Sequence, residues 1–197
     1  FAQQRLWFLD QIEPGGRAYI MVKAIELRGA LDASLLDGAL RALVNRHESL
    51  RTIFVSEAGR TLQVVSEPRA WKTPVVDLSG EADTRQLMLL LTDEASRSFD
   101  LSRGPLFRAR LYRLASDAHV LLLTMHHIIS DGWSMEILLR ELGQFYCSLS
   151  TGETAKLPEL RFQYRDFSRW QRDKLVSGHR CGSVVARINF TEGGGSS

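Results

Sequence analysis

Two adjacent histidines and a nearby aspartate are the residues of this sequence best suited to chemistry. His126 and His127 follow the apolar run 120–125, and Asp131 stands directly before Gly132. The run is short, apolar and rich in branched residues, which predicts a buried strand, and Asp-Gly predicts a tight connection after it. Both histidines are therefore expected at a strand end, on a loop held by a rigid scaffold, where functional groups are common.

The two histidines and the aspartate suit either acid–base chemistry or a purely structural role. Adjacent residues of an extended chain point to opposite sides, so one histidine can face a pocket and the other must find a hydrogen-bond partner in the core. An imidazole with its ordinary pKa of about 6.5 can act as a general base near neutral pH. A core histidine with Asp131 as a helix N-cap explains the same residues without chemistry. A metal site formed by His127 and Asp131 would need a helix here, because the two residues are four apart. Gly132 and the preceding strand make a helix at this position unfavourable.

The pattern His126-His127-x-x-x-Asp131-Gly132 resembles the HHxxxDG active-site motif of the condensation domains of nonribosomal peptide synthetases. That motif also marks their wider acyltransferase superfamily, which includes chloramphenicol acetyltransferase. The resemblance covers residues 1–173, the N-terminal half of a condensation domain. Further stretches resemble landmarks of that family and follow in its order: residues 2–9 (AQQRLWFL), 46–54 (RHESLRTIF), 101–109 (LSRGPLFRA) and 163–171 (QYRDFSRWQ).

The resemblance implies an α+β fold, the N-terminal lobe of the chloramphenicol-acetyltransferase-like fold, with a mixed and largely antiparallel sheet packed with helices. In that family two similar lobes form a V, and the active-site tunnel runs between them. Nothing in this sequence resembles the C-terminal lobe, so we expect the lobe to be inactive alone. We predict residues 1–173 as the lobe and residues 174–197, which end in Gly-Gly-Gly-Ser-Ser, as a non-family tail that is flexible or artificial.

The resemblance also implies roles for the residues around the motif. His127 would be the base, or the hydrogen-bonding group that positions the attacking amine, and His126 would be structural. Gly132 would let the loop turn and place its N–H near the developing oxyanion. Trp133 and Ser134 would contact substrate. The sequence of this segment resembles the subtype that joins an L-configured donor to an L-amino acid.

Asp131 is expected to form an ion pair with an arginine of the stretch 46–54. A buried aspartate is costly unless it is paired, and the guanidinium fork is its best partner. The resemblance implies that Arg51 or Arg46 supplies that partner, and we favour Arg51. Taken alone, two arginines and a histidine at a helix end are also compatible with a solvated turn, because charged residues are mostly exposed.

The partners that the resemblance implies are upstream and downstream peptidyl carrier proteins, the C-terminal lobe and an adjacent adenylation domain. The substrates would be thioesters on the carriers' phosphopantetheine arms, with no other cofactor and no metal. Two alternatives stay open: an acyltransferase of the same superfamily that acts on an alcohol, and an inert lobe that only docks carrier proteins.

The composition is that of an ordinary globular protein. The 197 residues are 44% apolar and carry a net charge of +2, which gives no reason to expect nucleic-acid or membrane binding. Two cysteines, Cys147 and Cys181, are too few for a disulfide framework, which favours a cytoplasmic location. The start has neither methionine nor the features of a signal peptide, so we expect an excerpt of a longer chain.

Hydrophobic periodicity predicts alternating helices and strands. Gly38 interrupts a predicted helix that begins after Asp32, and this suggests a close helix contact there. Residues 163–171 show an aromatic stripe typical of a packing helix. The predicted helices are 1–12, 32–46, 83–98 and 133–149, and the predicted strands are 19–27, a hairpin of 53–55 with 61–65, then 75–78, 107–114 and 120–125.

Overall fold

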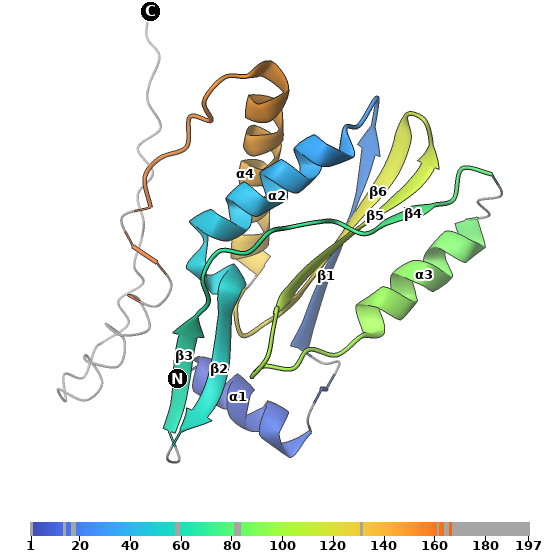
Figure 1. Cartoon of the computed structure of the whole chain (residues 1–197). Coiled ribbons are helices and arrows are strands. Elements are labelled where there is room, and N and C mark those ends of the chain that lie inside the picture. Colours follow the sequence, from blue (N-terminus) through green and yellow to red (C-terminus); the bar gives the residue numbers. More distant parts are fainter. Residues whose placement is uncertain are drawn as a thin grey trace, which may run out of the picture.

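A computed structural model shows a four-stranded sheet with helices on both faces and a separate two-stranded hairpin (Figure 1). It describes residues 2–13, 15–16, 19–57, 60–80, 84–130, 132–160, 162–163 and 166. The elements in chain order are α1 (Ala2–Ile12), β1 (Ile20–Arg28), α2 (Ala33–Arg46), the 3-10 helix η2 (Glu48–Arg51), β2 (Thr52–Glu57), β3 (Arg60–Val65), β4 (Val75–Asp77), α3 (Thr84–Ser96), β5 (Phe107–Ala115), β6 (Ala118–His126) and α4 (Gly132–Thr151).

The sheet has the order β1-β6-β5-β4, so β6 is an inner strand. It pairs antiparallel with β1, where Ile20 lies opposite His126, and antiparallel with β5, where Phe107 lies opposite Met125. β4 joins the other side of β5 in the parallel direction. The prediction of a mixed, largely antiparallel sheet packed with helices is therefore confirmed.

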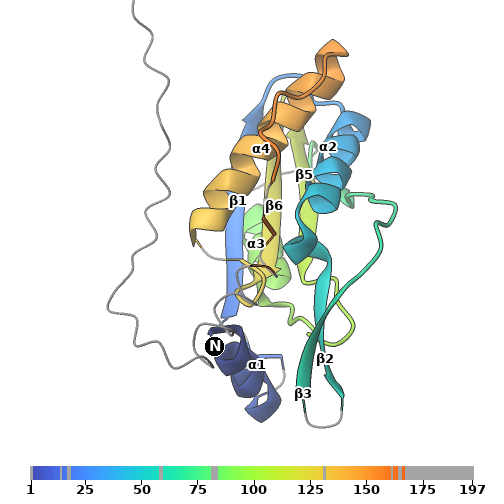
Figure 2. The ribbon, with the colours of Figure 1, turned by 90° about the vertical axis from the view of Figure 1, so that its left-hand side faces the viewer.

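Both faces of β6 are covered, which explains why its sequence is a continuous apolar run rather than an alternating one. Leu121, Leu123 and Met125 belong to the main core, which includes side chains of α2 and α4. Val120 and Leu122 belong to a second core against α3. Figure 2 shows the corresponding layers, with α2 and α4 on one side of the sheet and α3 behind it.

Helix α2 forms as its sequence predicts. The Asp32 side chain caps it by accepting hydrogen bonds from the backbone N–H groups of Ser34 and Leu35. Its apolar stripe is buried against α4. A Cβ atom at Gly38 would lie 2.9 Å from Leu149 Cδ1 of α4, so the predicted close helix contact is confirmed.

The remaining elements match their predicted positions closely. The turn η2, which was not predicted, separates α2 from β2. Most of the aromatic stretch 163–171 and all of the tail 174–197 lie outside the described residues. Within the described part of the chain, no helix combines the length and apolar character needed to cross a bilayer.

Two glycines in helix interiors, Gly38 and Gly143, allow the contact at Gly38 to be tested. Gly143 of α4 has no atom within 4 Å of an added Cβ. Gly143→Ala should therefore stabilise the fold by up to about 1 kcal/mol through helix propensity alone. Gly38→Ala should gain less, because Leu149 must move, and Gly38→Leu should cost about 1–3 kcal/mol by forcing α2 and α4 apart. Urea unfolding measures all three variants, and a Gly38→Leu variant as stable as the parent chain would contradict the contact.

Candidate functional site

The backbone around the two histidines is held by both neighbouring strands. The N–H of His126 donates to the carbonyl oxygen of Leu106, at 3.0 Å, and the N–H of His127 donates to that of Tyr19, at 2.7 Å. A turn follows, closed by a 3.1 Å bond from the N–H of Ile129 to the carbonyl oxygen of His126. The loop therefore leaves the sheet from a defined position, as expected for a functional strand end.

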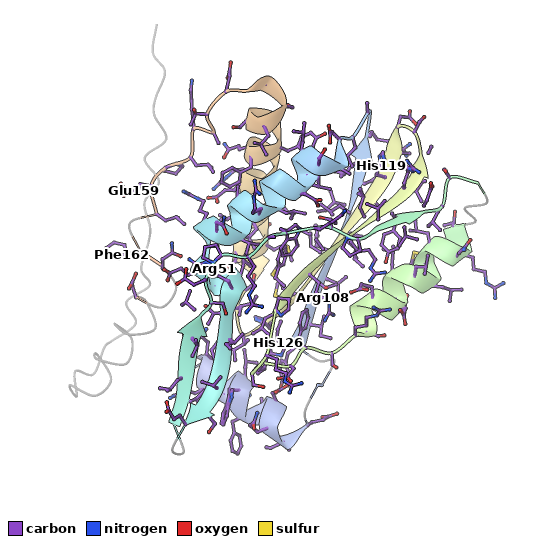
Figure 3. The ribbon with its side chains drawn as sticks, viewed as in Figure 1. Arg51, Arg108, His119, His126, Glu159 and Phe162 are labelled. Atoms are coloured by element: carbon purple, nitrogen blue, oxygen red, sulfur yellow. The ribbon has the colours of Figure 1, made fainter. Side chains whose placement is uncertain are left out.

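His126 lies in the protein interior at the lower end of the sheet (Figure 3). Its side chain is 2% exposed and lies beside Tyr19 and Phe99, with ring centroids 6.3 and 6.4 Å away. Nδ1 accepts a hydrogen bond of 3.1 Å from the N–H of Ile128, so the neutral ring carries its proton on Nε2. Burial, with a smaller contribution from the charge of His127, lowers the pKa of His126 to about 4. The ring is therefore neutral near pH 7.

His127 is exposed, whereas His126 is buried. The two side chains thus differ in the way that their adjacency in an extended chain predicts. Gly132 is exposed and is the first residue of α4, and Ser134 is half-buried in the first turn of that helix. Asp131 and the side chain of Trp133 lie outside the described residues.

A pair of glutamines supports the loop, and sequence reasoning missed it. Gln3 Nε2 of α1 donates to the carbonyl oxygen of Ile128, at 2.8 Å. Gln63 Nε2 of β3 in turn donates to Gln3 Oε1, at 2.6 Å. The opening stretch 2–9 was predicted as part of a helix, and through Gln3 that helix also joins the histidine loop to the hairpin. The available signal was Gln3 itself, a polar residue in a stretch that resembles a family landmark.

The two arginines considered as partners of Asp131 have different surroundings. Arg46 Nε lies 2.9 Å from Glu141 Oε2, and His47 Nε2 lies 2.7 Å from the same oxygen. Arg51 Nη1 donates to the carbonyl oxygen of Ser66, at 2.6 Å, and within the part of the chain that the structure describes it has no carboxylate partner. The ion pair with Asp131 stays a prediction, now with Arg46 engaged elsewhere.

Glu141 was not singled out from the sequence, although its position carried a signal. It is 3% exposed and occupies the stripe of α4 that also holds Leu138 and Leu142. A charged residue inside an apolar helix stripe needs a partner, because an unpaired buried charge is costly. Its contacts with Arg46 and His47 join the helix that begins at the histidine loop to the end of α2. Among the described residues, no three His, Cys, Asp or Glu side chains are grouped closely enough to hold a metal ion.

The lowered pKa of His126 makes stability depend on pH. The folded state holds this ring neutral down to about pH 4, whereas in the unfolded chain it takes up a proton below its ordinary value of 6.5. The unfolded state therefore binds more protons between these values, and stability falls as the pH drops from 6.5 to 4. We expect His126→Gln to remove about 2–3 kcal/mol of this pH-dependent loss. Urea unfolding of the parent chain and of His126→Gln at pH 7 and pH 4.5 measures this loss. An equal change in the free energy of unfolding with pH in both proteins would rule the effect out.

Comparisons with known proteins show the family of this chain. Residues 1–181 match the family model of the condensation domain. The chain is 45% identical over 179 residues to malpinin synthetase of Mortierella alpina, covering 90% of this chain and 2% of that protein. It is 43% identical over 183 residues to cyclosporin synthetase simA of Tolypocladium inflatum, covering 91% of this chain and 1% of that one.

Solved structures show the same fold. The starter condensation domain of rhizomide synthetase RzmA superposes with a TM-score of 0.81 at 23% identity, covering 89% of this chain and 44% of that one. The X-domain from teicoplanin biosynthesis superposes with a TM-score of 0.81 at 30% identity, covering 92% and 39%. The chain thus spans less than half of each domain. It belongs to the condensation domain family, of which it represents the N-terminal portion.

Proposed function

We propose that this chain is the N-terminal half of a peptide-bond-forming site of a nonribosomal peptide synthetase. The observation that carries the proposal is the exposed His127 at the held end of β6, within the HHxxxDG pattern of a chain from the condensation domain family. The substrates would be an acyl or peptidyl thioester on an upstream carrier and an aminoacyl thioester on a downstream carrier. Both would be attached through phosphopantetheine.

His127 would act on the attacking amine. The amine nitrogen forms a bond to the thioester carbonyl carbon, the carbon–sulfur bond breaks, and the amine loses a proton while the thiol leaves with one. An imidazole beside the amine can take that proton or hold the amine in line, and both roles need the same geometry. Because His126 is neutral near pH 7, it adds no positive charge beside His127.

The start of α4 would stabilise the negative charge that develops on the carbonyl oxygen. The first N–H groups of a helix have no intrahelical partner, and the helix dipole favours negative charge at that end. Gly132 is the first residue of α4 and is exposed, which supports its N–H as the oxyanion donor. Trp133 and Ser134 in the same turn would contact substrate. Asp131 would hold the loop through its ion pair with Arg51.

The proposal requires a second lobe. A tunnel between two lobes has only one wall in a chain that spans 44% of a solved condensation domain. Helix α1 also exposes Phe8 and Ile12, which are 60% and 66% exposed and one helical turn apart. Apolar residues placed together on a surface are typical of a face that a partner covers. The other partners would be the two carrier proteins and an adenylation domain, and the subtype would join an L-donor to an L-acceptor.

Single-turnover peptide bond formation between two loaded carrier proteins tests the proposal. Dipeptide should form only when a C-terminal lobe is added to the chain, and His127→Ala should lower the rate by about 100-fold or more, as loss of a general base does. Because His127 is exposed, the variant should unfold at the same urea concentration as the parent.

Arg28→Ala, at the far end of β1, is the control and should react normally. Carrier binding without product in either mixture would instead favour an inert docking lobe, and ester formation with an alcohol would favour another acyltransferase.

Double-mutant cycles test the ion pair of Asp131. Arg51→Ala and Asp131→Ala should show a coupling of about 1–3 kcal/mol in the free energy of unfolding, because contacting charges couple. The cycle of Arg46→Ala with Asp131→Ala is the matched control and should show almost none, since Arg46 is engaged by Glu141. A larger coupling for Arg46 than for Arg51 would reverse the assignment.

A further inference from the structure

A cavity of about 160 Å³ lies beside the hairpin, and its lining residues include Arg51, which is assigned above as the partner of Asp131. Its walls come from η2, the start of β2, the segment that follows β3 and the turn before β5. Arg51, at its edge, is labelled in Figure 3 at the upper end of the hairpin, whereas His126 lies at the lower end of the sheet. Among the described residues that line the cavity, neither His126 nor His127 is included.

The apolar walls are held in place by packing. Leu50 is 2% exposed and is part of the main core. Trp71 stacks on Phe107 with ring centroids 5.4 Å apart, and its Nε1 donates to Thr73 Oγ1 at 3.1 Å. The indole is thus fixed in orientation without any ligand. An engineered apolar cavity of about 150 Å³ holds one benzene molecule, so this volume suits a single six-membered ring.

The turn before β5 closes another side of the cavity. Gly104 has a φ of 58°, and a Cβ atom there would lie 2.8 Å from Ile53 Cγ2 of β2. The turn consequently lies directly against the hairpin strand, which only glycine allows at this position. This contact keeps Arg103 and Pro105 on the cavity wall.

The charged residues of the cavity are mainly basic. Arg51, Arg69 and Arg103 line it, against one carboxylate, that of Glu67. Within the described ranges of the chain none of the three arginines has a carboxylate oxygen within 4.0 Å. Arg51 is bonded to Ser66 and assigned above to Asp131, which leaves the guanidinium groups of Arg69 and Arg103. A guanidinium binds a carboxylate or phosphate through two parallel hydrogen bonds.

We propose that this cavity binds a small aromatic acid, with its ring between Leu50 and Trp71 and its carboxylate or phosphate at Arg69 and Arg103. The apolar walls and the ring-sized volume define the body of the ligand, and the basic edge defines its charge. The inference does not depend on the proposed peptide-bond formation, because Leu50, Trp71, Arg69 and Arg103 have no assigned role in that reaction.

Four probe compounds test the contributions of the aromatic ring and of the negative charge separately. Benzoate and phenyl phosphate carry both ring and charge, benzamide carries the ring alone, and acetate carries the charge alone. The indole N–H resonance of Trp71, assigned with a Trp71→Phe variant, reports binding in NMR titrations of the whole chain. We expect benzoate or phenyl phosphate to bind at least about tenfold more tightly than benzamide or acetate. Benzamide can make only the ring contacts, and acetate can make only the contacts of the charge.

Arginine variants locate the charge. Arg69→Gln and Arg103→Gln are exposed substitutions that should leave the fold intact and each weaken binding of the aromatic acid by about tenfold. Arg28→Gln is the matched control, because Arg28 pairs with Glu26 in β1 outside the cavity, and it should bind as the parent does. No saturable shift at millimolar probe, benzamide binding as tightly as benzoate, or binding unchanged by both cavity variants would each overturn the proposal.

Discussion

The burial of β6 on both faces is the constraint on which the rest of this lobe depends. The strand is paired on both edges and covered by two separate cores, so it has no freedom to slide or rotate. A shift of one residue in its register would exchange the side chains of the two faces and put His126 where His127 lies. The difference between a buried, neutral histidine and an exposed one is therefore a property of the strand pairing as a whole.

The same strand explains why much of the fold could be predicted from the sequence. Local signals in the sequence agree with the structure in three places. These are the six-residue apolar run of β6, the apolar stripe of α2 with its Asp32 cap, and the pattern of the hairpin. The order of strands in the sheet is a different matter, because β1 and β6 are distant in the chain and only tertiary packing brings them together. The family resemblance predicted a mixed, largely antiparallel sheet, but it did not predict the order of the strands.

The site could be predicted less completely. Local reasoning located the histidines and indicated that one is buried, but it did not find Gln3 on the carbonyl oxygen of Ile128 or Glu141 between Arg46 and His47. These contacts join residues from different elements, and no spacing rule within one segment can indicate them. Of the two contacts, the one of Glu141 was easier to predict from the sequence, because a charged residue in an apolar helix stripe indicates a buried partner.

The pairing of residue 20 with residue 126 also bears on how the lobe folds. This contact closes most of the described chain into one loop, and pairings so distant in sequence form slowly because the entropy of closure must be overcome first. During synthesis on the ribosome, β1 has no strand to pair with in its sheet until β6 has emerged. The histidine loop, which is bonded to Tyr19 beside β1, can take its final form only after that closure. Assembly of the site thus depends on a long-range pairing, and before that pairing forms the unpaired edges of β1 can associate with other chains.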